Sequence, residues 1–283
     1  TGDGIAFAYM LGAKIRNLSR VQFHPTAFAA EANRERFLIS EAGRGEGAVL
    51  LNCNGERFAH NYDKRGELAP RDVVSNAIAR EALRTNSEKF YLDITHKPAD
   101  FLRERFPMIS ERCLEEGVDI TKDWIPVFPC HHYLMGGIAV DENSFTGVNR
   151  LYAVGECSNT GVHGKNRLAS NSLLEALVFS KRAAKDISRR IHNPGFIAVH
   201  GATPPIKNGT APLPEGTRTQ IREIMQKCHF VIPDRNAAEK GLKTIEQIRA
   251  RLNNEAFCKT SDYCEAKSLA TCAAIILRGA ISR

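Results

Sequence analysis

The chain has 283 residues, of which 43% are hydrophobic, and a formal net charge of +7 at pH 7. This length suits one large domain or two to three smaller ones with a true core. The Lys and Arg residues are dispersed and form no run interleaved with aromatic residues, so a solvated surface with mild attraction for anionic metabolites is favoured over nucleic-acid binding. No signal peptide is visible, and the longest apolar run near the end, residues 272–277, is too short to cross a bilayer. We expect a soluble, cytoplasmic protein that does not bind a membrane.

Eight cysteines are dispersed along the chain, and no two of them form a C-x-x-C pair. A chain of this length does not need a disulfide framework. Zinc and iron–sulfur sites are therefore disfavoured, and we expect no metal and idle or buried thiols in a reducing compartment.

Hydrophobic spacing and turn residues predict alternating helices and strands as far as residue 191. Asn54-Gly55 suits a tight hairpin turn, Pro70 suits the first turn of a helix, and Pro107 divides a helical stretch in two. The predicted helices cover residues 3–13, 70–84, 99–116 (in two parts) and 171–191, and the predicted strands cover 18–24, 48–52, 56–59, 89–94, 124–127, 137–140 and 151–154.

Residues 193–216 contain five prolines and four glycines, a composition typical of a linker. Three helices are predicted after it, at 217–229, 234–253 and 260–281, and their apolar stripes indicate the packing faces of a small bundle. The chain as a whole is thus expected to combine α/β and α+β domains with a helical bundle at its end.

Four short strings place a cation or a proton donor beside a turn-forming Gly or Pro. Two His and two Arg from four separate segments would suit a small dicarboxylate, because Arg forks match carboxylate oxygens and His donates further hydrogen bonds. The strings are QFHPT at 22–26, PRD at 70–72, HYLMGG at 132–137 and HGKNRLASNSLLE at 163–175.

Each of these residues also has an ordinary structural interpretation. A lone histidine such as His24 is usually a satisfied core residue, and Arg71 at a helix start would pair with Asp72 or Glu67. The string GRGEG at 43–47 does not join a strand to a helix, so a tight turn that feeds the hairpin is favoured over a phosphate loop.

Taken together and in this order, the four strings resemble the flavoprotein family of succinate dehydrogenase, fumarate reductase and L-aspartate oxidase. The resemblance runs from Thr1 to about residue 191 and more weakly to residue 283. Ala169-Ser170 stand where dehydrogenases and fumarate reductases usually have Gly-Gly, and this pair resembles the L-aspartate oxidase branch, as does LDITHKP at 92–98. Lys165 departs from the usual Ala.

The resemblance implies a substrate site with separate roles for binding and proton transfer. His131 and His132 point to opposite sides of an extended segment, and the family string selects His132. The family places its acid/base at the position of Arg71, a role that requires desolvation and neighbouring cations because the pKa of arginine is very high. The residues implied to bind the substrate carboxylates are His24, Ser40, His132 and Arg167.

The resemblance also implies non-covalent FAD. The helix that begins near Ser172 can stabilise negative charge on a reduced flavin, and Gly136-Gly137 would permit close approach to a flat ring. The residues implied to contact FAD are Asp3, Glu156, Ser172 and Leu173.

Three domains are implied. They are the remaining part of a Rossmann-like FAD-binding domain at 1–18 and 134–192, an α+β substrate cap at 19–133, and a truncated helical domain at 205–283. The family's upstream βαβ unit, which holds the FAD pyrophosphate, does not precede Thr1. We therefore expect a fragment cut at both ends that by itself is inactive and lacks FAD.

The resemblance implies that the parent protein oxidises L-aspartate to iminoaspartate and passes electrons to oxygen or fumarate. Quinolinate synthase is the downstream partner implied by this chemistry, in NAD synthesis. The alternatives are a fumarate reductase or succinate dehydrogenase flavoprotein subunit and, from another class, a non-catalytic binding module.

Overall fold

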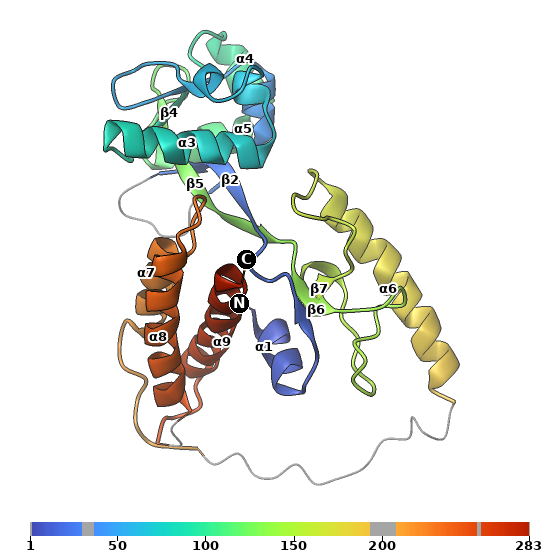
Figure 1. Cartoon of the computed structure of the whole chain (residues 1–283). Coiled ribbons are helices and arrows are strands. Elements are labelled where there is room, and N and C mark those ends of the chain that lie inside the picture. Colours follow the sequence, from blue (N-terminus) through green and yellow to red (C-terminus); the bar gives the residue numbers. More distant parts are fainter. Residues whose placement is uncertain (1, 30–36, 193–207, 254–255, 283) are drawn as a thin grey trace. The chain divides into compact units, whose positions relative to one another are not determined.

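The computed structural model describes residues 2–29, 37–192, 208–253 and 256–282. The chain divides into two compact units, and each is described here by itself. The terminal unit comprises Thr1–Val21 and Tyr133–Arg283, and the inserted unit comprises Gln22–His132. Figure 1 shows the elements of both units in chain order by colour.

The inserted unit is built on a four-stranded sheet in the order β2-β5-β4-β3. Strands β3 and β4 pair antiparallel with Leu50 opposite Leu92, and β4 pairs antiparallel with β5. Phe58, Phe90 and Ile78 are fully buried in its core. The strands are β2 (Val21–Phe28), β3 (Val49–Leu51), β4 (Tyr91–Asp93) and β5 (Ile125–Leu134), and the helices are α2 (Glu41–Gly45), α3 (Arg71–Thr85), α4 (Ala99–Arg105) and α5 (Pro107–Glu115), with 3-10 turns at Ala59–Asn61 and Gly66–Leu68.

The terminal unit combines a small sheet with helices from both ends of the chain. The sheet has the order β1-β6-β7, with β1 antiparallel and β7 parallel to β6. The elements of the terminal unit are α1 (Asp3–Met10), β1 (Ile15–Arg16), β6 (Gly137–Ala139), the 3-10 turn η3 (Gly155–Cys157), β7 (Ser158–Asn159), α6 (Asn171–Arg190), α7 (Thr217–Cys228), α8 (Arg235–Leu252) and α9 (Ser261–Ile281).

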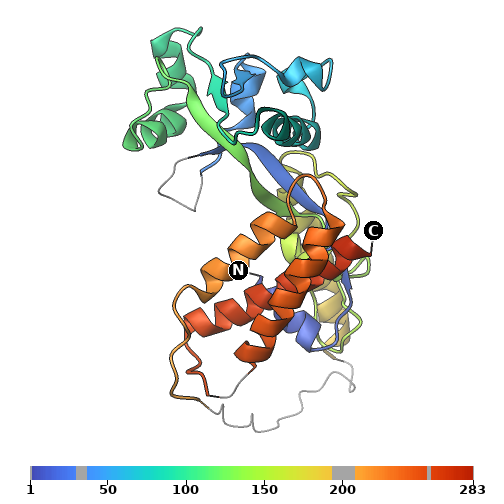
Figure 2. The same ribbon diagram turned by 60° about the vertical axis from the view of Figure 1, so that its left-hand side comes forward.

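Helices α7, α8 and α9 lie side by side, as Figures 1 and 2 show from two directions. Small residues on α9, including Ala266 and Ala270, are fully buried against Ile245 and Ile248 of α8. The three helices predicted in this region are confirmed. Their apolar residues recur at helical spacing, and the side chains of Asp234 and Thr260 cap the starts of α8 and α9.

Three local predictions differ from the structure. Residues 43–45 of the string predicted as a turn lie in α2, because Ser40 caps a short helix there with its hydroxyl oxygen, and only residues 46–47 form a turn. The second arm of the hairpin, 56–59, forms only a single bridge between Leu51 and Arg57, since the Asn52 side chain accepts the N–H groups of Asn54 and Glu56. Residues 151–154 form only a single bridge, from Tyr152 to Phe145.

The glycine pair at 136–137 lies close to the backbone of two other segments of the terminal unit. A Cβ at Gly136 would lie 2.1 Å from the carbonyl carbon of Asn17, and one at Gly137 would lie 2.4 Å from the carbonyl oxygen of Cys157. These glycines therefore let the backbone that follows β1 and the backbone of η3 approach closely. None of the helices in the described part of the chain has both the length and the apolar character that a membrane span needs.

Candidate functional site

His24 is buried on β2 of the inserted unit, with only 2% of its surface exposed. Its Nδ1 accepts a hydrogen bond from the Thr26 backbone N–H at 3.3 Å, and its ring lies edge-on to that of His132 on β5, with centroids 5.3 Å apart. Burial, followed by the positive charge of Arg71, lowers the pKa of His24 to about 3. The imidazole is therefore neutral. Because Nδ1 accepts a hydrogen bond, the ring hydrogen is on Nε2, and Nε2 can donate a hydrogen bond.

Arg71 begins α3 directly after Pro70 and extends its side chain to α2. Both Nε and Nη2 donate to Oε2 of Glu41, at 2.9 and 2.8 Å. The predicted partner Glu67 is engaged elsewhere, since its carboxylate receives two hydrogen bonds from the Arg57 guanidinium. The side chain of Arg71 is 13% exposed and that of Glu41 is 42% exposed, so this pair connects a nearly buried cation with solvent.

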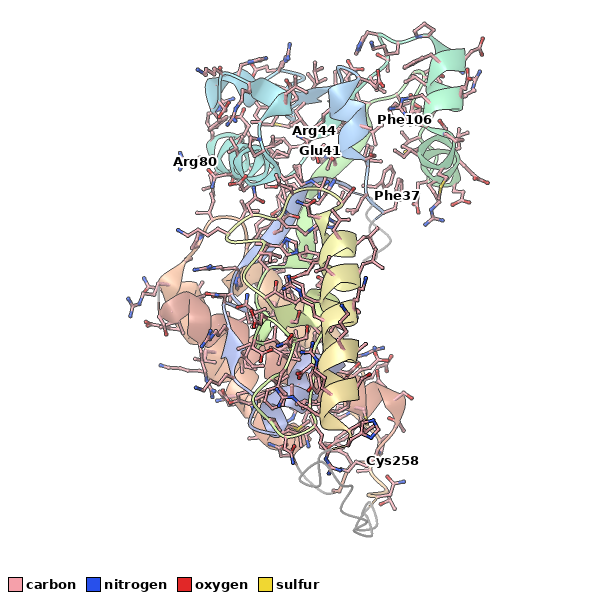
Figure 3. All side chains as sticks on the ribbon, turned by 90° about the vertical axis from the view of Figure 1, so that its right-hand side faces the viewer. Phe37, Glu41, Arg44, Arg80, Phe106 and Cys258 are labelled. Carbon is pink, nitrogen blue, oxygen red and sulfur yellow. The ribbon has the colours of Figure 1, made fainter. Side chains whose placement is uncertain are left out.

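Arg44 supplies a second cation beside this pair. It lies on α2, one turn after Glu41, and its Nη2 is 3.4 Å from Oε1 of that carboxylate. Figure 3 labels the two side chains together on this helix. The Arg44 guanidinium is almost fully buried, and its Nη1 donates to the Glu67 carbonyl oxygen at 2.6 Å. Burial lowers the pKa of Arg44, with a smaller contribution from the charge of Arg71.

The sequence analysis did not identify Glu41 or Arg44 as site residues. Both belong to the segment that begins at Ser40, whose own hydroxyl accepts the Ala42 N–H and starts the helix. The i, i+3 spacing of a carboxylate and an arginine after such a cap was the available signal. It did not reveal that Arg71, 30 residues away, completes the group.

In the terminal unit, Arg167 lies in the loop before α6 and is mostly buried. Its guanidinium carbon is 4.2 Å from the ring centroid of Tyr133, and Nη1 donates to the Leu168 carbonyl oxygen at 3.3 Å. A guanidinium supported on an aromatic face keeps its plane fixed, which suits a bidentate contact with a carboxylate.

The residues expected to contact FAD all belong to the terminal unit. Asp3 opens α1, and Oε1 of Glu156 accepts the Leu134 backbone N–H at 3.0 Å. Ser172 and Leu173 lie in the first turn of α6, a 20-residue helix whose N-terminus has no side-chain cap. A carboxylate oxygen for ribose hydroxyls and an uncapped helix start for a negative charge are groups that fit a flavin nucleotide.

The structure thus gathers His24, His132 and Arg71 in the inserted unit, with Ser40 on the segment that carries Glu41. Arg167 and the four expected FAD contacts belong to the terminal unit. Buried cations and neutral donors in one unit suit an anion, and the groups in the other unit are of the kind found in flavin-binding proteins.

Comparison with known proteins supports this class. Residues 1–173 match the model of the FAD binding domain family, and the chain belongs to that family. It is 55% identical over 194 residues to the L-aspartate oxidase of Clostridium perfringens, a match that covers 68% of this chain and 43% of that protein. It is 39% identical over its whole length to the chloroplastic L-aspartate oxidase 2-a of Nicotiana tabacum and covers 48% of that protein.

A solved quinol-fumarate reductase with menaquinol molecules has a similar fold, with a TM-score of 0.80 and 29% identity over all of this chain and 54% of that one. The chain therefore spans about half the length of the proteins it matches. The resemblance seen in the sequence strings is confirmed by these relatives.

Proposed function

We propose that this chain is part of a flavin-dependent enzyme that oxidises L-aspartate to iminoaspartate. The observation that carries the proposal is the group formed by neutral His24, His132 and the Arg71–Glu41–Arg44 cluster within one unit. The curated relatives are named L-aspartate oxidase, which agrees with a site for an amino dicarboxylate.

The chain's own residues would bind and orient the substrate. His24 and His132 would donate hydrogen bonds to one carboxylate, with the hydroxyl of Ser40 beside them, and Arg167 would hold the other carboxylate with its planar fork. The inserted unit would act as a substrate cap that excludes water from the reacting atoms. Asp3, Glu156, Ser172 and Leu173 would hold FAD, which when bound supplies the two-electron acceptor.

Arg71 would move a proton at the substrate carbon when fumarate is reduced. This role is supported by the low exposure of the Arg71 guanidinium and by the second cation, Arg44, beside it. Glu41 would exchange the proton with solvent through the bonds it accepts from Arg71. During aspartate oxidation the proton can instead leave from the substrate amino group.

We also propose the electron acceptor, the downstream enzyme and the cellular compartment of this reaction. Oxygen or fumarate would receive the electrons, quinolinate synthase would consume the product in NAD synthesis, and the enzyme would work in the cytoplasm.

A fumarate reductase or succinate dehydrogenase flavoprotein subunit is the second candidate, favoured by the fold match over the whole chain. The two are separated by mixing the whole FAD-loaded protein with L-aspartate or with succinate under anaerobic conditions and recording the flavin absorbance near 450 nm. We expect bleaching with aspartate that is much faster than with succinate. Bleaching by succinate alone would refute the proposed substrate.

The role of Arg71 is tested with Arg71→Lys in the whole protein, because lysine keeps the charge but loses the fork and its reach. Fumarate reduction is expected to fall by several orders of magnitude and aspartate oxidation by much less, measured as kcat in both directions with FAD content checked. Equal losses would show that Arg71 only positions the substrate.

A further inference from the structure

Glu175 is a buried carboxylate on α6 that receives hydrogen bonds from three different side chains. Oε1 accepts from the Thr160 hydroxyl at 2.5 Å, and Oε2 accepts from the Tyr133 hydroxyl at 3.3 Å and lies 2.8 Å from Nε2 of His163. Only 5% of the residue is exposed. None of the roles assigned above uses this carboxylate.

The apolar pattern of α6 around this residue is inverted. Leu173 and Leu177 are 70% and 71% exposed, while Glu175 between them is buried. Burying a carboxylate is unfavourable unless donors satisfy it, so an apolar residue would be the simpler choice for holding α6 against the sheet. The inversion indicates that the carboxylate itself is required at this position.

The donors to Glu175 come from the two segments that surround Arg167. Tyr133 is the next-to-last residue of β5 and supports the Arg167 guanidinium on its ring, while Thr160 and His163 belong to the loop that leads to Arg167. The rings of Tyr133 and His163 meet edge to face, with centroids 5.6 Å apart and planes at 89°. Glu175 is therefore hydrogen-bonded to the Tyr133 ring beneath Arg167 and also to the loop that contains Arg167.

The phenol of Tyr133 remains protonated and so remains a donor to Glu175. Burial raises the pKa of Tyr133, and the negative charges of Glu175 and Glu156 raise it further. The phenol is therefore protonated at neutral pH and can donate to the Glu175 carboxylate.

We propose that Glu175 is a positioning residue, which holds the Tyr133 ring and the 160–168 loop so that the Arg167 guanidinium is aligned for one carboxylate of a dicarboxylate ligand. This role rests on the proposed function of Arg167. A bidentate contact requires two guanidinium nitrogens to face the two oxygens of the carboxylate. The loss of a group that supports Arg167 displaces the guanidinium, even though the guanidinium itself is unchanged.

The test measures succinate binding to the whole FAD-loaded protein by calorimetry, so it does not depend on turnover. Glu175→Gln keeps the size of the side chain but places an NH₂ against donors, and we expect succinate Kd to rise about tenfold or more. The KM for aspartate should rise in parallel while kcat changes less than about twofold, because the reacting atoms are untouched.

Asp186→Asn is the matched control. Asp186 is also a buried carboxylate on α6, and it accepts the Tyr152 hydroxyl at 2.7 Å, but it lies three turns further along the helix. We expect its succinate Kd to stay within about twofold of the unmodified protein. An equal rise in both variants would overturn the proposal, since it would indicate a general effect of damaging α6.

A double-mutant cycle decides whether Glu175 acts through Arg167. In the Arg167→Leu background, Glu175→Gln should change succinate Kd by less than about twofold, because the group that it positions is gone. A tenfold effect that persists in that background would refute the proposal. If unmodified protein binds succinate but does not oxidise aspartate, the proposed substrate fails while the cycle still tests the positioning role.

Discussion

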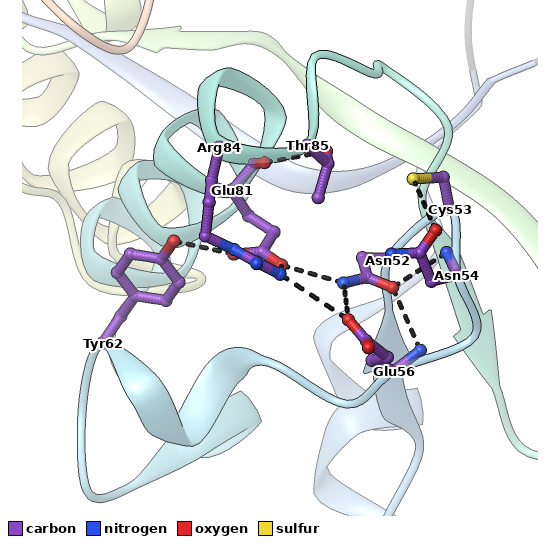
Figure 4. A network of polar contacts seen from close by, with 8 residues as sticks. All are labelled: Asn52, Cys53, Asn54, Glu56, Tyr62, Glu81, Arg84 and Thr85. Carbon is purple, nitrogen blue, oxygen red and sulfur yellow. Dashed lines mark hydrogen bonds and ion pairs between the residues drawn. The ribbon is translucent and has the colours of Figure 1, made fainter.

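A buried hydrogen-bond network in the inserted unit gives the sharpest prediction about stability (Figure 4). Glu81 on α3 is fully buried, and its carboxylate accepts from Asn52 Nδ2 at 2.9 Å, from the Tyr62 hydroxyl at 2.7 Å and from two nitrogens of Arg84 at 2.9 and 2.6 Å. Hydrogen bonds from Arg84, followed by those from Asn52 and Tyr62, lower the pKa of Glu81 from 4.5 to about 2.

This shift is a contribution to the free energy of unfolding. A pKa lowered from 4.5 to about 2 corresponds to about 3 kcal/mol at neutral pH. The Arg84 side chain is 57% exposed, and solvent screening of its charge reduces the expected contribution to about 2 kcal/mol. Because the folded pKa is below the unfolded pKa, the stabilisation is complete above pH 4.5 and is lost as the pH falls through 2.

Glu81→Gln removes the charge and turns an NH₂ toward donors, so it should lower the free energy of unfolding by about 2 kcal/mol at pH 7 and by clearly less at pH 3. Urea unfolding followed by the fluorescence of Trp124, the single tryptophan and a residue of the inserted unit, reports this change. Glu88→Gln, at an exposed position on the same unit, is the control and should change stability by less than about 0.5 kcal/mol. Equal losses in the two variants, or a loss that does not depend on pH, would refute this account of Glu81.

Two further predictions concern packing and reactivity. Gly241→Ala should destabilise the terminal unit by about 1–3 kcal/mol in thermal unfolding, because a Cβ there would lie 2.6 Å from Sγ of Cys228, whereas Gly4→Ala on α1, with open space around it, should not. Cys113 is fully buried and burial raises its pKa to about 12, so it should resist iodoacetamide at pH 8 in the native protein while exposed Cys53 is alkylated; mass spectrometry of the labelled peptides checks this.

The long helices could be predicted from the sequence because their signals are local. Helix α8 begins after the Asp234 cap, and apolar residues such as Ile245 and Ile248 recur on one face. Residues 151–154 have the composition of a strand, but only Tyr152 forms a bridge there. Strand pairing depends on which distant segment is a neighbour, and one sequence contains no record of that.

The same distinction separates the site residues that were predicted from those that were missed. His24, Arg71, His132 and Arg167 stand in strings that resemble a known family, so their candidacy followed from local sequence. The pairing of Arg71 with Glu41 joins positions 30 apart, and that of Tyr133 with Glu175 joins positions 42 apart. Such pairs are fixed by the tertiary fold, and in the sequence their charged members resemble ordinary surface charges.

The polar residues buried in the inserted unit fall into two kinds that differ in how completely they are satisfied. Glu81 and Glu67 each receive several hydrogen bonds from the protein, which is what a purely structural carboxylate requires. Arg44 instead keeps Nε and Nη2 without a hydrogen bond inside the described structure, and His24 is held neutral beside cations. Unsatisfied donors and a depressed imidazole pKa lower stability, and a protein retains such features where a ligand completes the bonding. Arg44 therefore distinguishes this part of the unit from the Glu81 network, because its buried cation is incompletely satisfied while the Glu81 carboxylate is fully engaged.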